Sequence, residues 1–313
     1  MSPNGTHAIP RYREYPKCQR CGLLETELST KLKRCTGCKI ATYCSKECQK
    51  EAWSTHRLIC RVTDSSTNTG FELKPNLLAG YPAAIALEYA VTEWHGVHNF
   101  AISTITTATA ELHGGVDHGI ASSHVIFFSL IARPAGNDRS TANAFHLREA
   151  IMVPMENLSF MADSWRENRS AYKSAEEDIR SKFPDDNSFA GMLPAAFVVQ
   201  KTTYMMSCHI PVHRRVENPR AMRPHERVVL QDIRQMCIGT VNSGHIFRVA
   251  ASGSGKADPD VGTVVQRKKN CEWRIEEDWD WHAVLGSRPG QSGTTKSGLH
   301  PREVWAAYYM LPW

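Results

Sequence analysis

Seven cysteines and one histidine lie close together near the start of the chain, and their side chains are of the kind that binds metal ions. They form four pairs with short internal spacings: Cys18-x2-Cys21, Cys35-x2-Cys38, Cys44-x3-Cys48 and His56-x3-Cys60. Zn²⁺ prefers four thiolate or imidazole ligands in a tetrahedron, and a Cys-x2-Cys turn brings two thiolates to one ion. Eight ligands at these spacings predict two zinc ions, while the spacing alone leaves open which pairs share an ion.

A disulfide framework is the main alternative for a cysteine-rich segment. Seven is an odd number, residues 1–17 have no apolar stretch typical of a secretory signal, and intracellular thiols stay reduced. Chance clustering would not also place a histidine at zinc spacing. We therefore expect a metal-binding, intracellular protein of the nucleus or the cytoplasm.

The same segment predicts the helix that positions several ligands. Ser45 is a suitable N-cap for a helix that runs to about Ile59, and Glu47 in its first turn is favoured by the helix dipole. On this helix His56 and Cys60 are four residues apart, so both side chains project from one face toward one metal ion.

The run CTGCKIATYCSKECQKEAWSTHRLIC from Cys35, together with Cys18 and Cys21, closely resembles the MYND zinc finger. The resemblance covers residues 18–60 and includes all eight ligands, although the thirteen-residue gap after Cys21 is on the long side. It implies a cross-braced fold, in which the first ion is bound by Cys18, Cys21, Cys44 and Cys48. The second ion would be bound by Cys35, Cys38, His56 and Cys60.

The resemblance also implies a role in protein–protein interaction. Fingers of this family often bind short proline-containing peptides in a shallow groove beside the last helix, and the matching positions here are Tyr43, Ser45, Gln49 and Trp53. Gln49 and Trp53 are four residues apart on the expected helix, which places an amide beside a large apolar surface. The alternative is that Trp53 forms the small core of the finger.

Charge does not favour nucleic acid as the partner. Residues 1–63 contain 12 Lys+Arg and 5 Asp+Glu, in a chain of net charge +5. The basic residues are scattered and no recognition-helix pattern is present, so binding of nucleic acid is the weaker interpretation. A membrane span is not expected, because the chain has no long uncharged apolar window.

The chain is expected to contain a basic tail at 1–17, the finger at 18–60, a linker at 61–70 and a mixed α/β domain at 71–313, which makes the fold class α+β. Helices are predicted within 81–112, 158–183 and 226–237 and from 301, and strands at 122–133, 193–203, 204–212 and 244–251. Residues 145–155 fit either state. Loops are expected at 252–262 and 286–298. The tryptophan-rich segment 271–285 is expected to fill a core beside an acidic face, with a partner-binding patch as the alternative.

No catalytic residue can be named in 71–313. Three groups of chemically capable residues are predicted to be structural or exposed, because none has the third ligand and open position of a metal site: His95 with His98; His113 with Asp117 and His118; and Cys208 with His209 and His213. Segment 250–257 lacks two of the residues of a phosphate loop. MYND fingers also occur in SET-domain methyltransferases, but only 17 residues precede Cys18 and no Asn-His-Ser motif follows.

The preferred interpretation is a protein that recruits partners or acts as a scaffold; the alternative is an enzyme whose active site lies in 71–313, with the finger as a targeting module.

Overall fold

The computed structural model covers the 313-residue chain, and the structure describes residues 18, 20–21, 23, 25, 28–36, 42–60, 78–81, 84–122, 124–133, 140–155, 162–182, 188–214, 222–250, 258–267, 270–285 and 294–311, without the side chains of 54–60, 162–171, 266–267 and 270–271. The chain divides into two compact units: Met1–Gly96 with Lys201–Tyr204, and Val97–Gln200 with Met205–Trp313. The predicted tail and linker lie outside the described residues, so those boundaries stay predictions.

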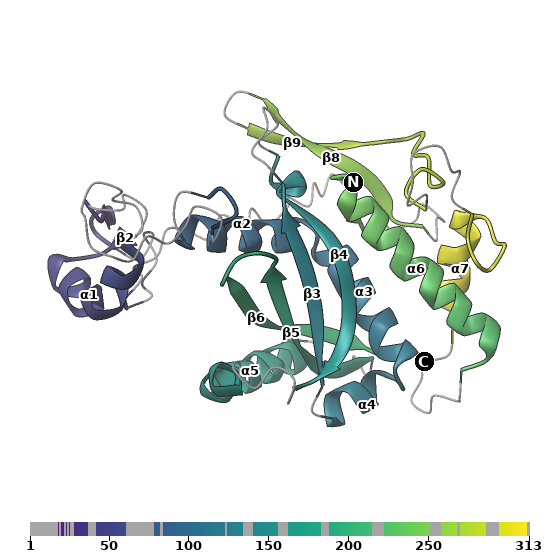
Figure 1. The fold of residues 1–313 in the computed structure, drawn as a ribbon, viewed down its shortest axis with the longest axis horizontal. Helices are drawn as coiled ribbons and strands as arrows, with labels where there is room; N and C mark the ends of the chain where they lie inside the picture. Colours follow the sequence, from purple (N-terminus) through teal and green to yellow (C-terminus); the bar gives the residue numbers. More distant parts are fainter. Residues whose placement is uncertain are drawn as a thin grey trace, which may run out of the picture. The chain divides into compact units, whose positions relative to one another are not determined.

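The first unit contains the finger, which combines a two-stranded sheet with one helix. Strands β1 (Lys33–Arg34) and β2 (Thr42–Tyr43) pair antiparallel, helix α1 covers Lys46–Cys60, and helix α2 (Ala84–Val97) follows (Figure 1). A small core is formed by Cys18, Cys35, Tyr43 and Ala52, with Leu32, Cys44 and Cys48 against it. The predicted helix start at Ser45 is confirmed, because α1 begins at the next residue.

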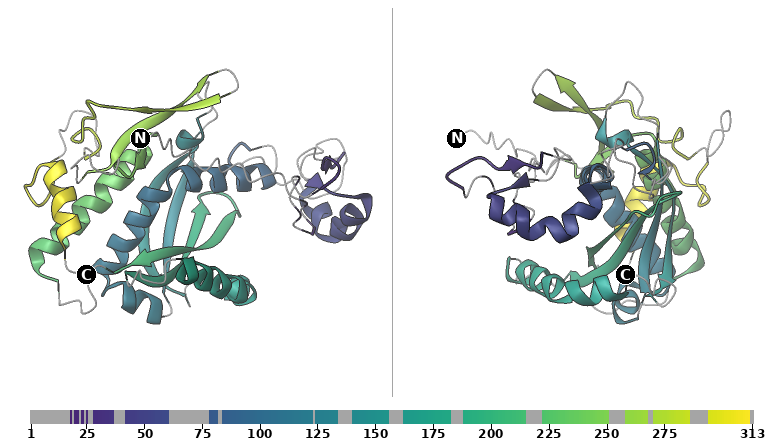
Figure 2. Two further views of the ribbon diagram at one scale, coloured as in Figure 1. Left: turned by 180° about the vertical axis from the view of Figure 1, so that it is seen from behind. Right: turned by 60° about the vertical axis from the view of Figure 1, so that its left-hand side comes forward.

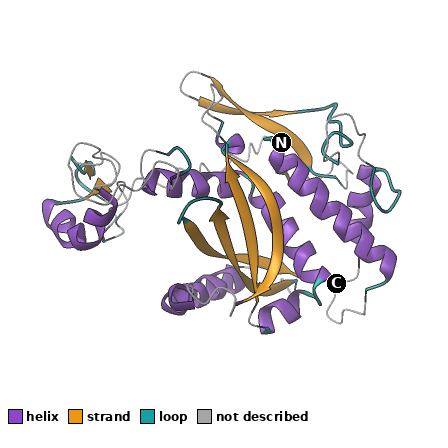
Figure 3. Ribbon diagram, viewed as in Figure 1, coloured by secondary structure: helices purple, strands orange, loops and turns teal. Residues whose placement is uncertain are grey.

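The second unit is built on a mixed four-stranded sheet with the order β4-β3-β5-β6. Its strands are β3 (His124–Ala132), β4 (Phe145–Pro154), β5 (Phe189–Val199) and β6 (Met205–His213). Strands β3 and β5 run parallel, and the other two pairings are antiparallel. The helices are α3 (Asn99–Leu112), α4 (Val116–Ala121), α5 (Ala162–Lys182), α6 (Pro224–Asn242) and α7 (Pro301–Met310), with a short 3₁₀ turn η4 (Thr141–Asn143). Figure 3 shows these helices and strands together, as the predicted α+β class requires.

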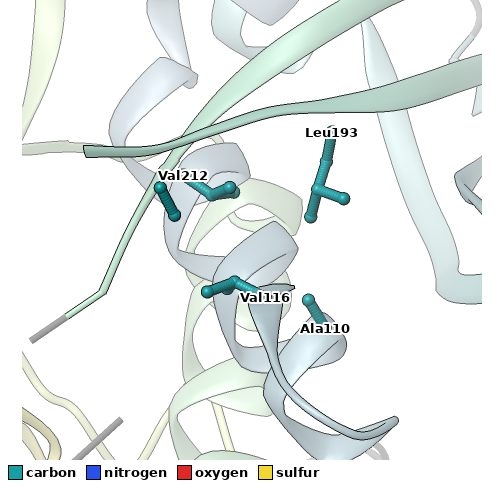
Figure 4. Packing of buried hydrophobic residues seen from close by; sticks show 5 residues of the cluster. Ala110, Val116, Leu193 and Val212 are labelled. Atoms are coloured by element: carbon teal, nitrogen blue, oxygen red, sulfur yellow. The ribbon is translucent and has the colours of Figure 1, made fainter. Parts of the chain in front are cut away.

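The main core lies between one face of this sheet and helices α3, α4 and α6. The rings of Phe128 and Phe197, on neighbouring strands, stack with centroids 4.5 Å apart, and both side chains are fully buried. Toward one end of the sheet, a cluster joins α3 and α4 to β5 and β6 (Figure 4): Ala110, Val116, Ala190, Leu193 and Val212. Alternation along each strand thus directs one set of side chains to this core.

Helix α5 packs on the opposite face of the sheet. Tyr172 of α5 packs against a cluster around Val125 and Ala196, which belong to the alternate positions of β3 and β5. Because successive side chains of a strand point to opposite faces, the sheet separates this cluster from the main core. Figure 2 shows the sheet and its helices from two further directions.

The C-terminal helix α7 closes an aromatic cluster. Trp305 is fully buried, and its ring lies 5.6 Å from that of Phe247, 6.2 Å from Phe100 and 6.3 Å from Trp281. The backbone N–H of His300 donates to Glu303 Oε2 at 2.8 Å, which caps the start of the helix after the expected Pro301. The helix predicted from 301 is therefore confirmed, and its aromatic side chains pack within the second unit.

A second sheet, of order β7-β8-β9, was only partly expected. Strands β7 (Ile246–Arg248), β8 (Asp260–Arg267) and β9 (Asn270–Ile275) are all antiparallel. The predicted loop at 252–262 is therefore wrong at its end, because β8 begins at Asp260. Glycine at position 262 permits the pairing of β8 with β9. The Cβ of any other residue there would lie 2.1 Å from the carbonyl oxygen of Arg274, which is too close. The ambiguous segment 145–155 is a strand because it pairs along the whole length of β3.

Among the residues that the structure describes, no helix has the length and apolar character needed to span a bilayer.

Candidate metal centre and recognition face

Four cysteines of the finger come together as a group with the geometry of a zinc site. The sulfur atoms of Cys18, Cys21, Cys44 and Cys48 all lie within 4.8 Å of one another. The Sγ of Cys44 lies 3.6 Å from that of Cys21 and 3.4 Å from that of Cys48. A tetrahedral ion with Zn–S bonds of about 2.3 Å would hold its sulfurs about 3.8 Å apart. The four side chains therefore fit Zn²⁺ with only small adjustments.

Local backbone structure brings these cysteines together. The N–H of Cys18 donates to the carbonyl oxygen of Leu23 at 2.8 Å, which closes a turn around the first pair. Cys44 directly follows β2, and Cys48 lies in the first turn of α1. The N–H of Cys48 donates to Ser45 Oγ at 3.1 Å, as an N-cap requires. A turn, a strand end and a helix start thus meet at one point.

Without a cation, the four sulfurs compete for protons. Burial raises the pKa of the Cys18 thiol, but backbone N–H groups of Cys21 and Cys44 donate to its sulfur, and its pKa is lowered to about 6. Hydrogen bonding with Cys48 and the other two sulfurs raises the pKa of Cys44 to about 12. The group thus favours thiolate at one position and thiol at another, and a divalent cation would favour thiolate at all four.

The other predicted ligands are described only in part. Cys35 is buried in the small core of the finger, and Cys38 lies outside the described residues. His56 and Cys60 both lie on α1, as expected, but their side chains are not described. The second zinc site therefore stays a prediction.

The four predicted recognition residues occupy different environments. Tyr43 is 1% exposed and belongs to the core of the finger, because β2 directs it inward. Ser45 is half-buried, and its hydroxyl oxygen accepts the capping hydrogen bond. Gln49 is half-buried, whereas Trp53 is 41% exposed. Trp53 is not among the described residues that form the small core of the finger.

The chemically capable side chains of the second unit make contacts within the protein. His98 Nε2 lies 3.0 Å from the carbonyl oxygen of Ala142, and His113 Nδ1 lies 2.8 Å from that of Thr109. The ring of His209 stacks on Tyr172 with centroids 3.4 Å apart. Within the described ranges, the four cysteines of the finger form the one group of three or more His, Cys, Asp or Glu residues placed to bind a metal ion.

The MYND finger family matches residues 17–60 of this chain. Histone-lysine N-methyltransferase SMYD3 of Mus musculus is 56% identical over 48 residues, which are 15% of this chain and 10% of SMYD3. Egl nine homolog 1 of Homo sapiens is 31% identical over 83 residues, 26% of this chain and 18% of that protein. Tudor domain-containing protein 1 of Mus musculus is 43% identical over 51 residues, 16% of this chain and 4% of that protein.

These similarities define a module rather than a whole protein. Residues 17–60 are a MYND finger, a zinc-binding module that mediates protein–protein interaction. The chain spans less than a fifth of the length of each of these relatives. No solved structure is significantly similar to this chain.

Proposed function

We propose that this protein recruits a protein partner through its MYND finger, which binds two zinc ions and presents one face of helix α1 to a short proline-containing peptide. The first ion would be bound by Cys18, Cys21, Cys44 and Cys48. The second would be bound by the predicted set Cys35, Cys38, His56 and Cys60. The proposal places the protein inside the cell, where thiols remain available as ligands.

The exposure of Trp53 is the observation that carries this proposal. A tryptophan that is 41% exposed in so small a domain leaves a large flat apolar area in contact with water. Such residues are frequent anchors in protein interfaces, where burial of the ring supplies much of the affinity. Gln49, one helical turn earlier, offers an amide that can pair with the backbone of an extended peptide.

The experiment compares Trp53→Ala with Tyr309→Ala in the full-length, zinc-loaded chain. Proline-containing peptides would be selected from a display library on immobilised protein, and their affinity measured by fluorescence anisotropy. Tyr309 is an aromatic residue of α7 that is 43% exposed. Tyr309→Ala therefore removes a similarly exposed aromatic ring, but outside the finger. Loss of an anchor costs about 2–4 kcal/mol, so we expect Trp53→Ala to weaken binding roughly thirtyfold or more.

Zinc content must be measured on the same samples. We expect Trp53→Ala to retain the zinc of the parent protein, because the core of the finger is formed by other residues. Unchanged peptide affinity with zinc retained would refute the recognition role of Trp53. Loss of zinc in Trp53→Ala would show that the ring stabilises the finger instead.

We propose no reaction for residues 71–313. The alternative that an active site lies there, with the finger as a targeting module, stays a prediction. It could be tested by soaking crystals of the protein with a fragment library: a pocket that binds fragments beside convergent polar side chains would support an enzyme.

A further inference from the structure

The exposed face of α1 carries more than one tryptophan. Lys46, Gln49, Lys50 and Trp53 are spaced i, i+3, i+4 and i+7, so they form one continuous row along the helix. Both lysines and the tryptophan are exposed, and Gln49 is half-buried. We call these four residues the α1 row. It combines an apolar ring, an amide and two cations.

The two lysines of this row are exposed within the described part of the finger. Lys46 and Lys50 form no ion pair there, and neither does the exposed Lys33 of β1.

Two carboxylates of α1 lie beside the α1 row, and they favour an acidic peptide over a nucleic acid as its partner. Glu47 and Glu51 are four residues apart, and Glu51 pairs with Arg20 at 3.4 Å. A nucleic acid backbone carries a phosphate at every nucleotide, and phosphates passing these carboxylates would be repelled. A peptide can place carboxylates opposite the lysines and leave neutral residues opposite Glu47. The arrangement favours a peptide.

From this charge pattern we infer that the α1 row binds an acidic peptide segment, with an apolar side chain against Trp53 and carboxylates beside Lys46 and Lys50. This inference rests on the proposed function and names the chemistry of the partner. Because exposed ion pairs contribute little each, acidity would select among peptides rather than supply most of the affinity.

The test uses the full-length, zinc-loaded chain and two fluorescein-labelled peptides that share a Pro-Leu core. One peptide has glutamates on both sides of the core, and the other has glutamines. At low salt we expect the glutamate peptide to bind roughly three- to tenfold more tightly. Lys50→Glu should abolish this preference, and added salt should reduce it. The control is Lys173→Glu, which makes the same charge change at an exposed position of α5.

The outcomes separate this inference from the proposed function. Equal affinity for both peptides, with Trp53→Ala still weakening both, would overturn the acidic preference and leave recruitment intact. Binding of the glutamine peptide that does not depend on Trp53 would instead count against the proposed function. If Lys173→Glu acts like Lys50→Glu, the effect is one of net charge and the inference fails. It also fails if a DNA or RNA oligonucleotide displaces the glutamate peptide at lower concentration than unlabelled peptide does.

Discussion

The backbone N–H of Cys48 donates a hydrogen bond to Ser45 Oγ at 3.1 Å, so the residue that caps helix α1 also fixes the backbone of a cysteine in the metal group. The start of the helix and the geometry of the site are therefore coupled. Local helix formation by residues 46–60 helps to hold Cys48 beside Cys44 before a metal ion is bound.

This coupling makes Ser45→Ala a test of the site. Removing an N-cap hydroxyl costs about 1 kcal/mol, which corresponds to roughly a fivefold loss in zinc affinity if the finger folds as it binds. Competition with a zinc chelator would measure the change. Ser29→Ala is the control, because Ser29 is exposed and makes no hydrogen bond within the described residues. Equal zinc affinity in both variants would show that the cap does not support the site.

Zinc stoichiometry tests the two-ion proposal. Elemental analysis of the reduced protein should give two zinc ions per chain, and Cys44→Ala should lower this number because its sulfur belongs to the four-cysteine group. Cys208→Ala, which removes a half-buried thiol of β6, should keep both ions. A parent protein that contains a single ion would refute the second site while leaving the first in place.

Two helical glycines are predicted to respond in opposite ways to alanine. A Cβ at Gly239 of α6 would lie 2.0 Å from the carbonyl oxygen of Val284, so Gly239→Ala should destabilise the protein by about 1–3 kcal/mol or more. At Gly96 of α2 nothing lies within 4 Å of the added Cβ. Gly96→Ala should therefore stabilise it by about 0.5–1 kcal/mol. Urea unfolding of both variants would measure the difference, and a neutral Gly239→Ala would contradict this packing of α6.

The stability of the second unit should fall in mild acid partly because of His209. Burial lowers the pKa of His209 from 6.5 to about 4, so between these values the unfolded chain binds a proton that the folded chain does not. Stability is therefore lost as the pH falls from about 6.5 to about 4. In His209→Phe, which keeps a ring against Tyr172, urea midpoints measured across this range should depend less on pH. Identical pH dependence in the two proteins would contradict this role.

The zinc finger could be predicted from the sequence because its signals are local. The spacing of the cysteines from Cys18 to Cys48 and the capping residue Ser45 each act within a few residues, where turn and helix geometry follow directly from sequence separation. Helices α3, α5, α6 and α7 of the second unit and its strands β3, β5 and β6 could be predicted for a similar reason, since their apolar patterns are regular, whereas the short helix α4 was not predicted.

Other features were decided by contacts between distant segments. Residues 145–155 became a strand because β3 pairs with them, and Asp260 begins a strand because Gly262 admits the close approach of Arg274. Sequence similarity placed Tyr43 and Trp53 together as recognition residues, yet packing buries Tyr43 and leaves Trp53 exposed. The sequence by itself determined which residues can bind zinc and where α1 begins, because these depend on local spacing. Only the tertiary structure decided which aromatic ring faces solvent, because burial depends on every segment that packs around it.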